Sequence, residues 1–161
     1  MSRIEEQLKS LGLTLPAPLQ LPVEDRPNHA SITLAGGFAY VSGQGPMDGD
    51  EPLAVGKVGS DLTVEQGAEA ARLTALSMLA LLKDRLGDLD RVSRWIRAVG
   101  YVNCTTGFGL TPLVVNGFSD LIVDVWGQNG VHARSAPGVA ALPLNVPVIV
   151  EAMVQVDTHY E

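Results

Sequence analysis

The segment from Val146 to Val156 constrains the fold more than any other part of the chain. Its even-numbered residues are all valine or alanine, whereas its odd-numbered residues mix Pro, Ile, Glu, Met and Gln. Successive side chains of a β-strand point to opposite faces, so this period of two predicts a strand with one fully apolar face. We expect helices to cover the apolar face, and a site or another subunit to meet the mixed face.

Two helical patterns accompany this strand. Thr63 and Gln66 have the spacing of a capping box, and the apolar stripe that follows ends at Gly87. Thr111, followed by a proline, is predicted as the N-cap of a second amphipathic helix that ends at Gly127. Both helices have an apolar stripe and can therefore pack on one side of a sheet.

The remaining strands complete the order of elements. A hairpin is predicted around Gly36-Gly37, because two glycines supply the positive φ that a tight turn needs. Further strands are predicted within 91–103 and from His132 to about Gly138. The order β-β-α-β-α-β-β predicts an α+β fold, a single mixed β-sheet with two helices packed on one face.

The first 26 residues are expected to form an addition to this domain. Ser2 precedes a short helical pattern that Gly12 ends, and a segment rich in proline follows it. Proline prevents that segment from being a helix or a central strand. We therefore expect residues 1–26 to be an N-terminal helix with a Pro-rich connector, and residues 27–161 to be the main domain.

Composition excludes several classes of partner. The formal net charge is −7 and the basic residues are scattered, which opposes binding to nucleic acid. No run of 18 apolar residues is present, so no membrane span is expected. Three histidines and one cysteine, Cys104, show no metal-ligand spacing. The single cysteine fits a reducing compartment, and a cytoplasmic location is expected.

One arginine is isolated in a long stretch of uncharged and acidic residues. From Ala98 to Glu161 there is no lysine, and Arg134 is the only arginine. An isolated cation of this kind needs a partner when it is buried. It could bind an anionic ligand, or it could pair with Glu151 or with Asp120 or Asp124 of a neighbouring subunit.

Several motifs together resemble the RidA/YjgF family, in a divergent branch. These are "VSGQGP" after the hairpin, "NG" within the second helix, "ARSAPGVAALP", and "VEA" in the last strand, in the order typical of that family over about residues 27 to 157. The resemblance implies a chorismate-mutase-like fold and a homotrimer with clefts between subunits. It also implies hydrolysis of reactive 2-imino or enamine acids to 2-keto acids and ammonia, without a metal or organic cofactor.

The resemblance also implies which residues bind the ligand. Arg134 matches the arginine that binds the substrate carboxylate, a role that suits a planar guanidinium with parallel donors. Backbone N–H groups near Gly43 and Ala136 would complete this clamp. Ser42 matches a serine that faces the ligand, and Asn116 matches an asparagine of the second helix that lines the cleft.

Two positions depart from the family pattern. The glutamate that activates water in the deaminases falls on Ile149, which cannot accept a proton, and Glu151 matches a second glutamate. Glu151 should lie on the same face as Ile149, about 6–7 Å along the strand. His29 falls near the place of a tyrosine in the deaminases and could titrate near neutral pH.

Three functions follow from these residues. The first is a hydrolytic deaminase in which Arg134 binds the carboxylate, Ser42 and Asn116 position the ligand, and Glu151 or His29 handles water. The alternative is a trimer that binds or senses a small carboxylate without turnover, because Ile149 replaces the base. An endoribonuclease or translation inhibitor, the third possibility, is disfavoured by the negative charge.

Overall fold

The computed structural model describes residues 2–20 and 28–157, and it contains one main sheet with helices on one side. The three α-helices are α1 (Arg3–Ser10), α2 (Val64–Leu86) and α3 (Thr111–Trp126). The strands are β1 (Ile32–Ala35), β2 (Phe38–Gln44), β3 (Met47–Asp48), β4 (Glu51–Pro52), β5 (Val92–Asn103), β6 (Ala133–Ser135), β7 (Gly138–Val139) and β8 (Val148–Val156). Short 3₁₀ turns are η2 (Leu89–Arg91), η3 (Gly127–Gly130) and η4 (Pro143–Asn145).

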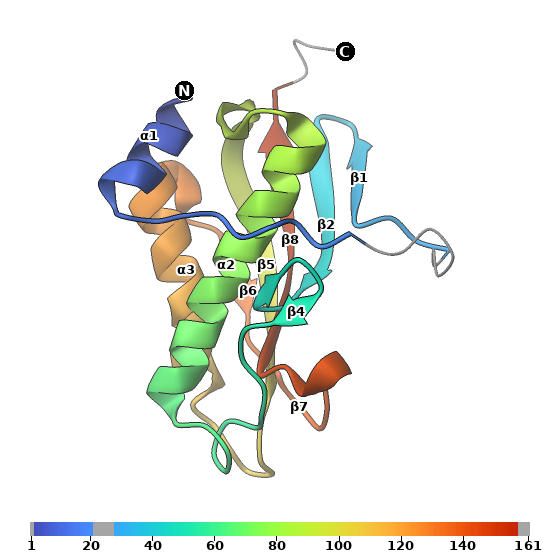
Figure 1. The fold of residues 1–161 in the computed structure, drawn as a ribbon, viewed down its shortest axis with the longest axis vertical. Coiled ribbons are helices and arrows are strands. Elements are labelled where there is room, and N and C mark those ends of the chain that lie inside the picture. The colour runs from blue at the N-terminus through green and yellow to red at the C-terminus, as the bar shows by residue number, and fades with distance from the viewer. Residues whose placement is uncertain (1, 21–27, 158–161) are drawn as a thin grey trace.

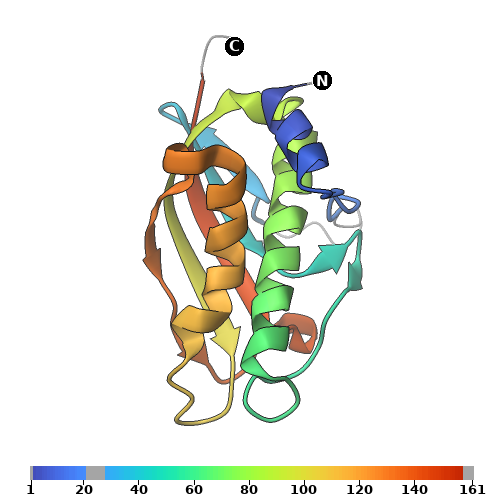
Figure 2. The same ribbon diagram turned by 90° about the vertical axis from the view of Figure 1, so that its left-hand side faces the viewer.

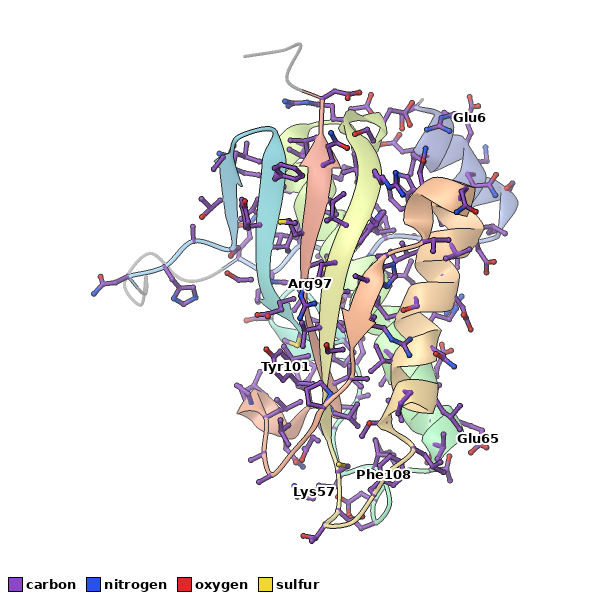
Figure 3. The ribbon with its side chains drawn as sticks, turned by 180° about the vertical axis from the view of Figure 1, so that it is seen from behind. Glu6, Lys57, Glu65, Arg97, Tyr101 and Phe108 are labelled. Carbon is purple, nitrogen blue, oxygen red and sulfur yellow. The ribbon has the colours of Figure 1, made fainter. Side chains whose placement is uncertain are left out.

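The main sheet has the order β1-β2-β8-β5-β6, and β7 also pairs with β5. The pairs β1–β2, β2–β8 and β8–β5 are antiparallel, whereas β6 and β7 run parallel to β5. Helices α2 and α3 lie side by side over one face (Figures 1 and 2), and the other face is open (Figure 3). The predicted α+β fold, a mixed sheet with two helices on one face, is confirmed.

The last strand shows why the helices lie on that face. Its buried positions alternate with half-buried and exposed ones, so Val148, Val150 and Val154 face the helices and Glu151 does not. Trp95 of β5 and Phe118 of α3 meet in the same core, with their rings 5.8 Å apart and nearly perpendicular. Burial of these apolar side chains is the main force that holds sheet and helices together.

The two covering helices approach each other closely at one glycine. A Cβ added to Gly117 of α3 would lie 1.9 Å from the backbone oxygen of Ala68 in α2. Only a residue without a side chain fits there. This contact sets the position of α3, and therefore the position of the α3 side chains at the edge of the sheet.

Helix α1 packs on the main core although it lies far from the sheet in sequence. Ser2 is its N-cap, as its position before the helical pattern predicts, and Ile4 and Leu8 are buried. The carboxylate of Asp90 accepts hydrogen bonds from the backbone N–H groups of Arg3 and Ile4, both at 2.8 Å. Part of the predicted connector, residues 21–27, lies outside the described residues.

Several sequence-based boundaries differ from the structure. The prediction that Thr111 is an N-cap is wrong, because α3 begins at Thr111 itself. The hydroxyl of Thr111 instead donates to the carbonyl of Ala136 at 2.6 Å. The strand predicted from His132 to Gly138 is two short strands, β6 and β7, with Pro137 between them. The glycine-rich loop after β2 contains a small hairpin, β3–β4, that was not predicted, although its two loop residues, Gly49 and Asp50, are typical of a hairpin turn.

No helix within the described residues is both long enough and apolar enough to cross a lipid bilayer.

Candidate functional site

Arg134 lies on β6, an edge strand of the main sheet, close to α3. Its register partner on β5 is Ala98, which is buried under the helices, so the two side chains share the helix-covered side. Nη1 of Arg134 donates to Oδ1 of Asn116 at 2.9 Å and to Oγ of Ser119 at 3.1 Å. Nη2 donates to the carbonyl of Pro112 at 3.3 Å. Three groups of α3 therefore hold the guanidinium.

All three acceptors of Arg134 are electrically neutral. Within the described residues the ion pairs are Arg72–Glu69 and Lys83–Glu5, and neither involves Arg134. The suggested pair between Arg134 and Glu151 of the same subunit is wrong, because the two side chains lie on opposite sides of the sheet. A guanidinium has five N–H donors, and the described residues accept three of them. Among residues 2–20 and 28–157, therefore, two of its N–H donors have no hydrogen-bond acceptor and its charge has no carboxylate within ion-pair distance.

Ser119 links Arg134 to a histidine that the sequence analysis did not select. Oγ of Ser119 lies 3.0 Å from Nε2 of His132, and Nδ1 of His132 lies 2.7 Å from the carbonyl of Gly130. Burial lowers the pKa of His132 from its usual value, the hydrogen bond to Gly130 opposes this shift, and the charge of Arg134 adds to it. His132 is therefore neutral at neutral pH.

A second group of polar side chains lies on the open face of the sheet (Figure 3). Tyr101 of β5 donates its hydroxyl to Oε1 of Glu151 at 3.2 Å. Burial and the neighbouring Glu151 raise the pKa of Tyr101, while Arg97 opposes the shift. A cavity of about 420 Å³ lies beside them, and its lining includes Ser42, Arg97 and Glu151.

Ser42, Gly43 and Ile149 lie together where β2 meets β8. The ladder between these strands is irregular between Val41 and Gln44, and a Cβ on Gly43 would be 2.7 Å from Cγ2 of Ile149. Gly43 thus allows Ile149 to pack against the backbone. The hydroxyl of Ser42 donates to the carbonyl of Ala30 at 2.7 Å, which ties the segment before β1 to the sheet.

The predicted site residues therefore form two groups in one chain. Arg134, Asn116 and Ala136 belong to the edge beside α3, where the carbonyl of Ala136 is held by Thr111. The open-face group consists of Ser42, Gly43, Ile149 and Glu151, and exposed His29 precedes the Ala30 that Ser42 contacts. Sequence reasoning missed Ser119, His132 and Tyr101.

Simple periodicity could have found two of the missed residues. Ser119 follows Asn116 by three positions in a helix, so both side chains lie on the same side. His132 precedes Arg134 by two positions in extended chain, so they share a face. The described residues contain no cluster of three His, Cys, Asp or Glu side chains that could hold a metal ion.

Comparison with known proteins decides the family. The family model described as "YjgF/chorismate_mutase-like, putative endoribonuclease" matches residues 5–156. The chain belongs to the RidA/YjgF family. The match begins within α1, at residue 5.

Two similar proteins match this chain over nearly its whole length. "Protein TCP17" of Trypanosoma cruzi is 38% identical over 156 residues, which are 96% of this chain and 95% of that protein. The crystal structure of Atu1372 from Agrobacterium tumefaciens, a protein described as of unknown function, is 40% identical. The match covers 96% of this chain and 92% of that one, with a TM-score of 0.84.

A third relative has the same architecture at lower identity. It is the crystal structure of a protein from Shewanella oneidensis that is described as "a putative endoribonuclease". It is 29% identical and covers 95% of this chain and 99% of its own, with a TM-score of 0.86.

Proposed function

We propose that this protein binds a small carboxylate-bearing metabolite, a 2-keto or 2-imino acid, through Arg134. The observation that carries the proposal is the guanidinium held by Asn116, Ser119 and Pro112, none of which neutralises it. A planar carboxylate can accept two parallel N–H donors and supply the missing negative charge. The family resemblance of Arg134 points to the same role.

We propose further that the binding site forms between subunits of a homotrimer. Arg134 and Asn116 lie at the edge of the sheet, whereas Ser42, Gly43, Ile149 and Glu151 lie on its open face. Within one chain the two groups lie on opposite sides of the sheet, whereas the edge of one subunit can meet the open face of the next. The open face exposes 47% of Tyr40, an apolar area that a neighbouring subunit would cover.

The reaction that fits this site is hydrolysis of an imine, with Glu151 as the base. Glu151 would take a proton from water as the oxygen bonds to the imine carbon, and it would pass this proton to the imine nitrogen, which receives the electron pair of the broken π bond. The resulting carbinolamine loses ammonia and becomes a 2-keto acid. Tyr101, which donates to Glu151, would hold the carboxylate in place, and exposed His29 is the second candidate for moving the proton.

Binding without turnover is the second candidate function. It is favoured by Ile149, which stands where the resemblance places the water-activating glutamate and packs against Gly43. An isoleucine there would exclude water from the position where a base should hold it. The endoribonuclease function in the family description is not proposed, because a net charge of −7 opposes binding to RNA. A cytoplasmic location remains part of the proposal.

Calorimetry with pyruvate and 2-oxobutanoate tests the binding. We expect binding by the wild type and its loss in Arg134→Gln, because the amide has no charge to offer the carboxylate. Arg85→Gln is the matched control, since Arg85 is an exposed arginine in the last turn of α2. Equal binding by the wild type and Arg134→Gln would refute the site.

Ammonia release from imino acids generated in place by an amino-acid oxidase then separates the two functions. Turnover that is lost in Glu151→Gln supports the deaminase, and binding without turnover supports the second candidate.

Mixed trimers test whether two subunits share the site. Inactive Arg134→Gln and inactive Glu151→Gln subunits, refolded together in equal amounts, should recover about a quarter of the wild-type sites. No recovery would mean that Arg134 and Glu151 act in a site within one subunit, or that they belong to two different sites.

A further inference from the structure

We infer that Ser119 and His132 are positioning residues that hold the Arg134 guanidinium in one orientation, with its free N–H groups directed at the ligand. This inference rests on the proposed function of Arg134 and names the residues that prepare it for binding. Its basis is a continuous chain of hydrogen bonds from Arg134 through Ser119 and His132 to the carbonyl of Gly130.

The direction of every hydrogen bond in this chain follows from chemistry. The carbonyl of Gly130 can only accept, so Nδ1 of His132 carries the proton of the neutral ring. Nε2 must then accept, and its partner is the hydroxyl of Ser119. Arg134 can only donate, so the oxygen of Ser119 accepts from Nη1 while its hydrogen points to His132.

The histidine end of the chain is itself held in place. The ring of His132 packs edge-on against Phe118 at 6.2 Å and lies 6.4 Å from Trp95, both of which are fully buried. Of the charged groups in the described residues, Arg134 acts on the charge of His132, and Arg94 lines a cavity of about 310 Å³ together with His132. The contacts of its ring with α3 and η3 include Phe118, Ser119 and the carbonyl of Gly130, all of which are uncharged.

This arrangement orients the arginine without cancelling its charge. An aspartate in place of Ser119 would also hold the guanidinium, but it would neutralise the charge that attracts the substrate. Two hydrogen bonds on Nη1 instead lower the conformational entropy that binding must remove, and they leave Nε and one N–H of Nη2 for the carboxylate. Protonation of His132 would make Nε2 a donor, which leaves the Ser119 hydrogen without an acceptor.

Side-chain NMR of Arg134 in the free protein tests the orientation directly. We expect separate, slowly exchanging signals for the two Nη groups in the wild type, assigned by their absence in Arg134→Lys. They should average in Ser119→Ala and persist in Ser119→Thr, which keeps the hydroxyl. His132→Phe retains the aromatic packing but has no acceptor, so it should weaken the separation. In the wild type, but not in His132→Phe, the signals should also begin to average as the pH falls and the imidazole is protonated.

Pyruvate binding supplies the second readout. Ser119→Ala should bind about tenfold more weakly than the wild type, while Ser119→Thr and the distant Ser10→Ala should bind as the wild type does. Averaged Nη signals in the wild type, or unchanged signals in Ser119→Ala, would overturn the inference. Absence of pyruvate binding by the wild type would refute the proposed function, whereas the NMR result would still decide whether Ser119 and His132 orient Arg134.

Discussion

The two faces of the main sheet carry different kinds of side chain, although the side chains of each strand point to the two faces in turn. On the helix-covered face, Val148, Val150 and Val154 of β8 are fully buried in an apolar core. On the open face of the same strand, Glu151 is exposed and contacts Tyr101, beside a cavity of about 420 Å³. The first face holds the fold together, and the second exposes polar side chains around a cavity.

Two arginines on neighbouring strands show the same contrast. Arg97 of β5 lies on the open face and lines the cavity, whereas Arg134 of β6 lies on the helix-covered side and is held by α3. Arg97 pairs in register with Ala133, the residue immediately before Arg134. A shift of one position along a strand therefore decides whether an arginine lies free on a surface or is oriented by a helix.

The largest expected effect is on the helix layer. Gly117→Ala places a methyl group against the backbone of Ala68, which cannot move away without displacing α2. We expect a loss of about 3 kcal/mol in the free energy of unfolding, measured by urea denaturation. Gly109→Ala is the control, because nothing lies within 4 Å of a Cβ there. Equal stability of the two variants would contradict the close packing of α2 on α3.

Shortening a side chain of β8 should have different effects on its two faces. Val150→Ala removes buried volume under the helices and should cost about 2 kcal/mol of unfolding free energy. Met153→Ala, on the half-buried open face, should cost about 1 kcal/mol or less in the isolated subunit, although it removes more atoms. A larger cost for Met153→Ala that rises with protein concentration would show that another subunit covers the open face.

A smaller effect, measured by spectroscopy, is expected for the contact between Tyr101 and Glu151 on the open face. The pKa of Tyr101 is raised by burial and by Glu151, so Glu151→Gln should lower it toward the usual value of 10.0. Tyrosinate absorbance during an alkaline titration measures this, with Tyr101→Phe to identify the signal. Because the folded pKa exceeds the unfolded one, this pair stabilises the fold below about pH 10, and the contribution is lost as the pH rises. An unchanged Tyr101 pKa in Glu151→Gln would contradict the contact.

The smallest effect is expected at His132, on the helix-covered side. Its folded pKa is lowered from 6.5, so the unfolded chain binds more protons as the pH falls below that value. The free energy of unfolding should therefore decrease between about pH 7.5 and about pH 5.5. His132→Phe should show a smaller decrease, because it has no proton to take up. Parallel decreases in both proteins would show that His132 does not titrate differently in the folded state.

Local patterns predicted much of the architecture. The alternation in Val146–Val156 predicted which face of the last strand is buried, and the capping box at Thr63 and Gln66 predicted the start of α2, both of which the structure confirms. These signals succeed because they depend on neighbours within a few residues. Thr111 was misassigned because its hydroxyl bonds to Ala136, a residue 25 positions away that no local pattern reveals.

Local residue patterns were enough to predict the apolar faces, the order of the main helices and strands without the hairpin β3–β4, and the position of Arg134, the only lysine or arginine after Ala98. Long-range packing was needed to bring Arg134 to α3, to join it through Ser119 to His132 by hydrogen bonds, and to place Glu151 with Tyr101 on the opposite face. Strand register and helix packing depend on residues that are far apart in the chain, and they select the acceptors that surround a side chain. The chemical type of a side chain does not by itself determine which acceptors surround it.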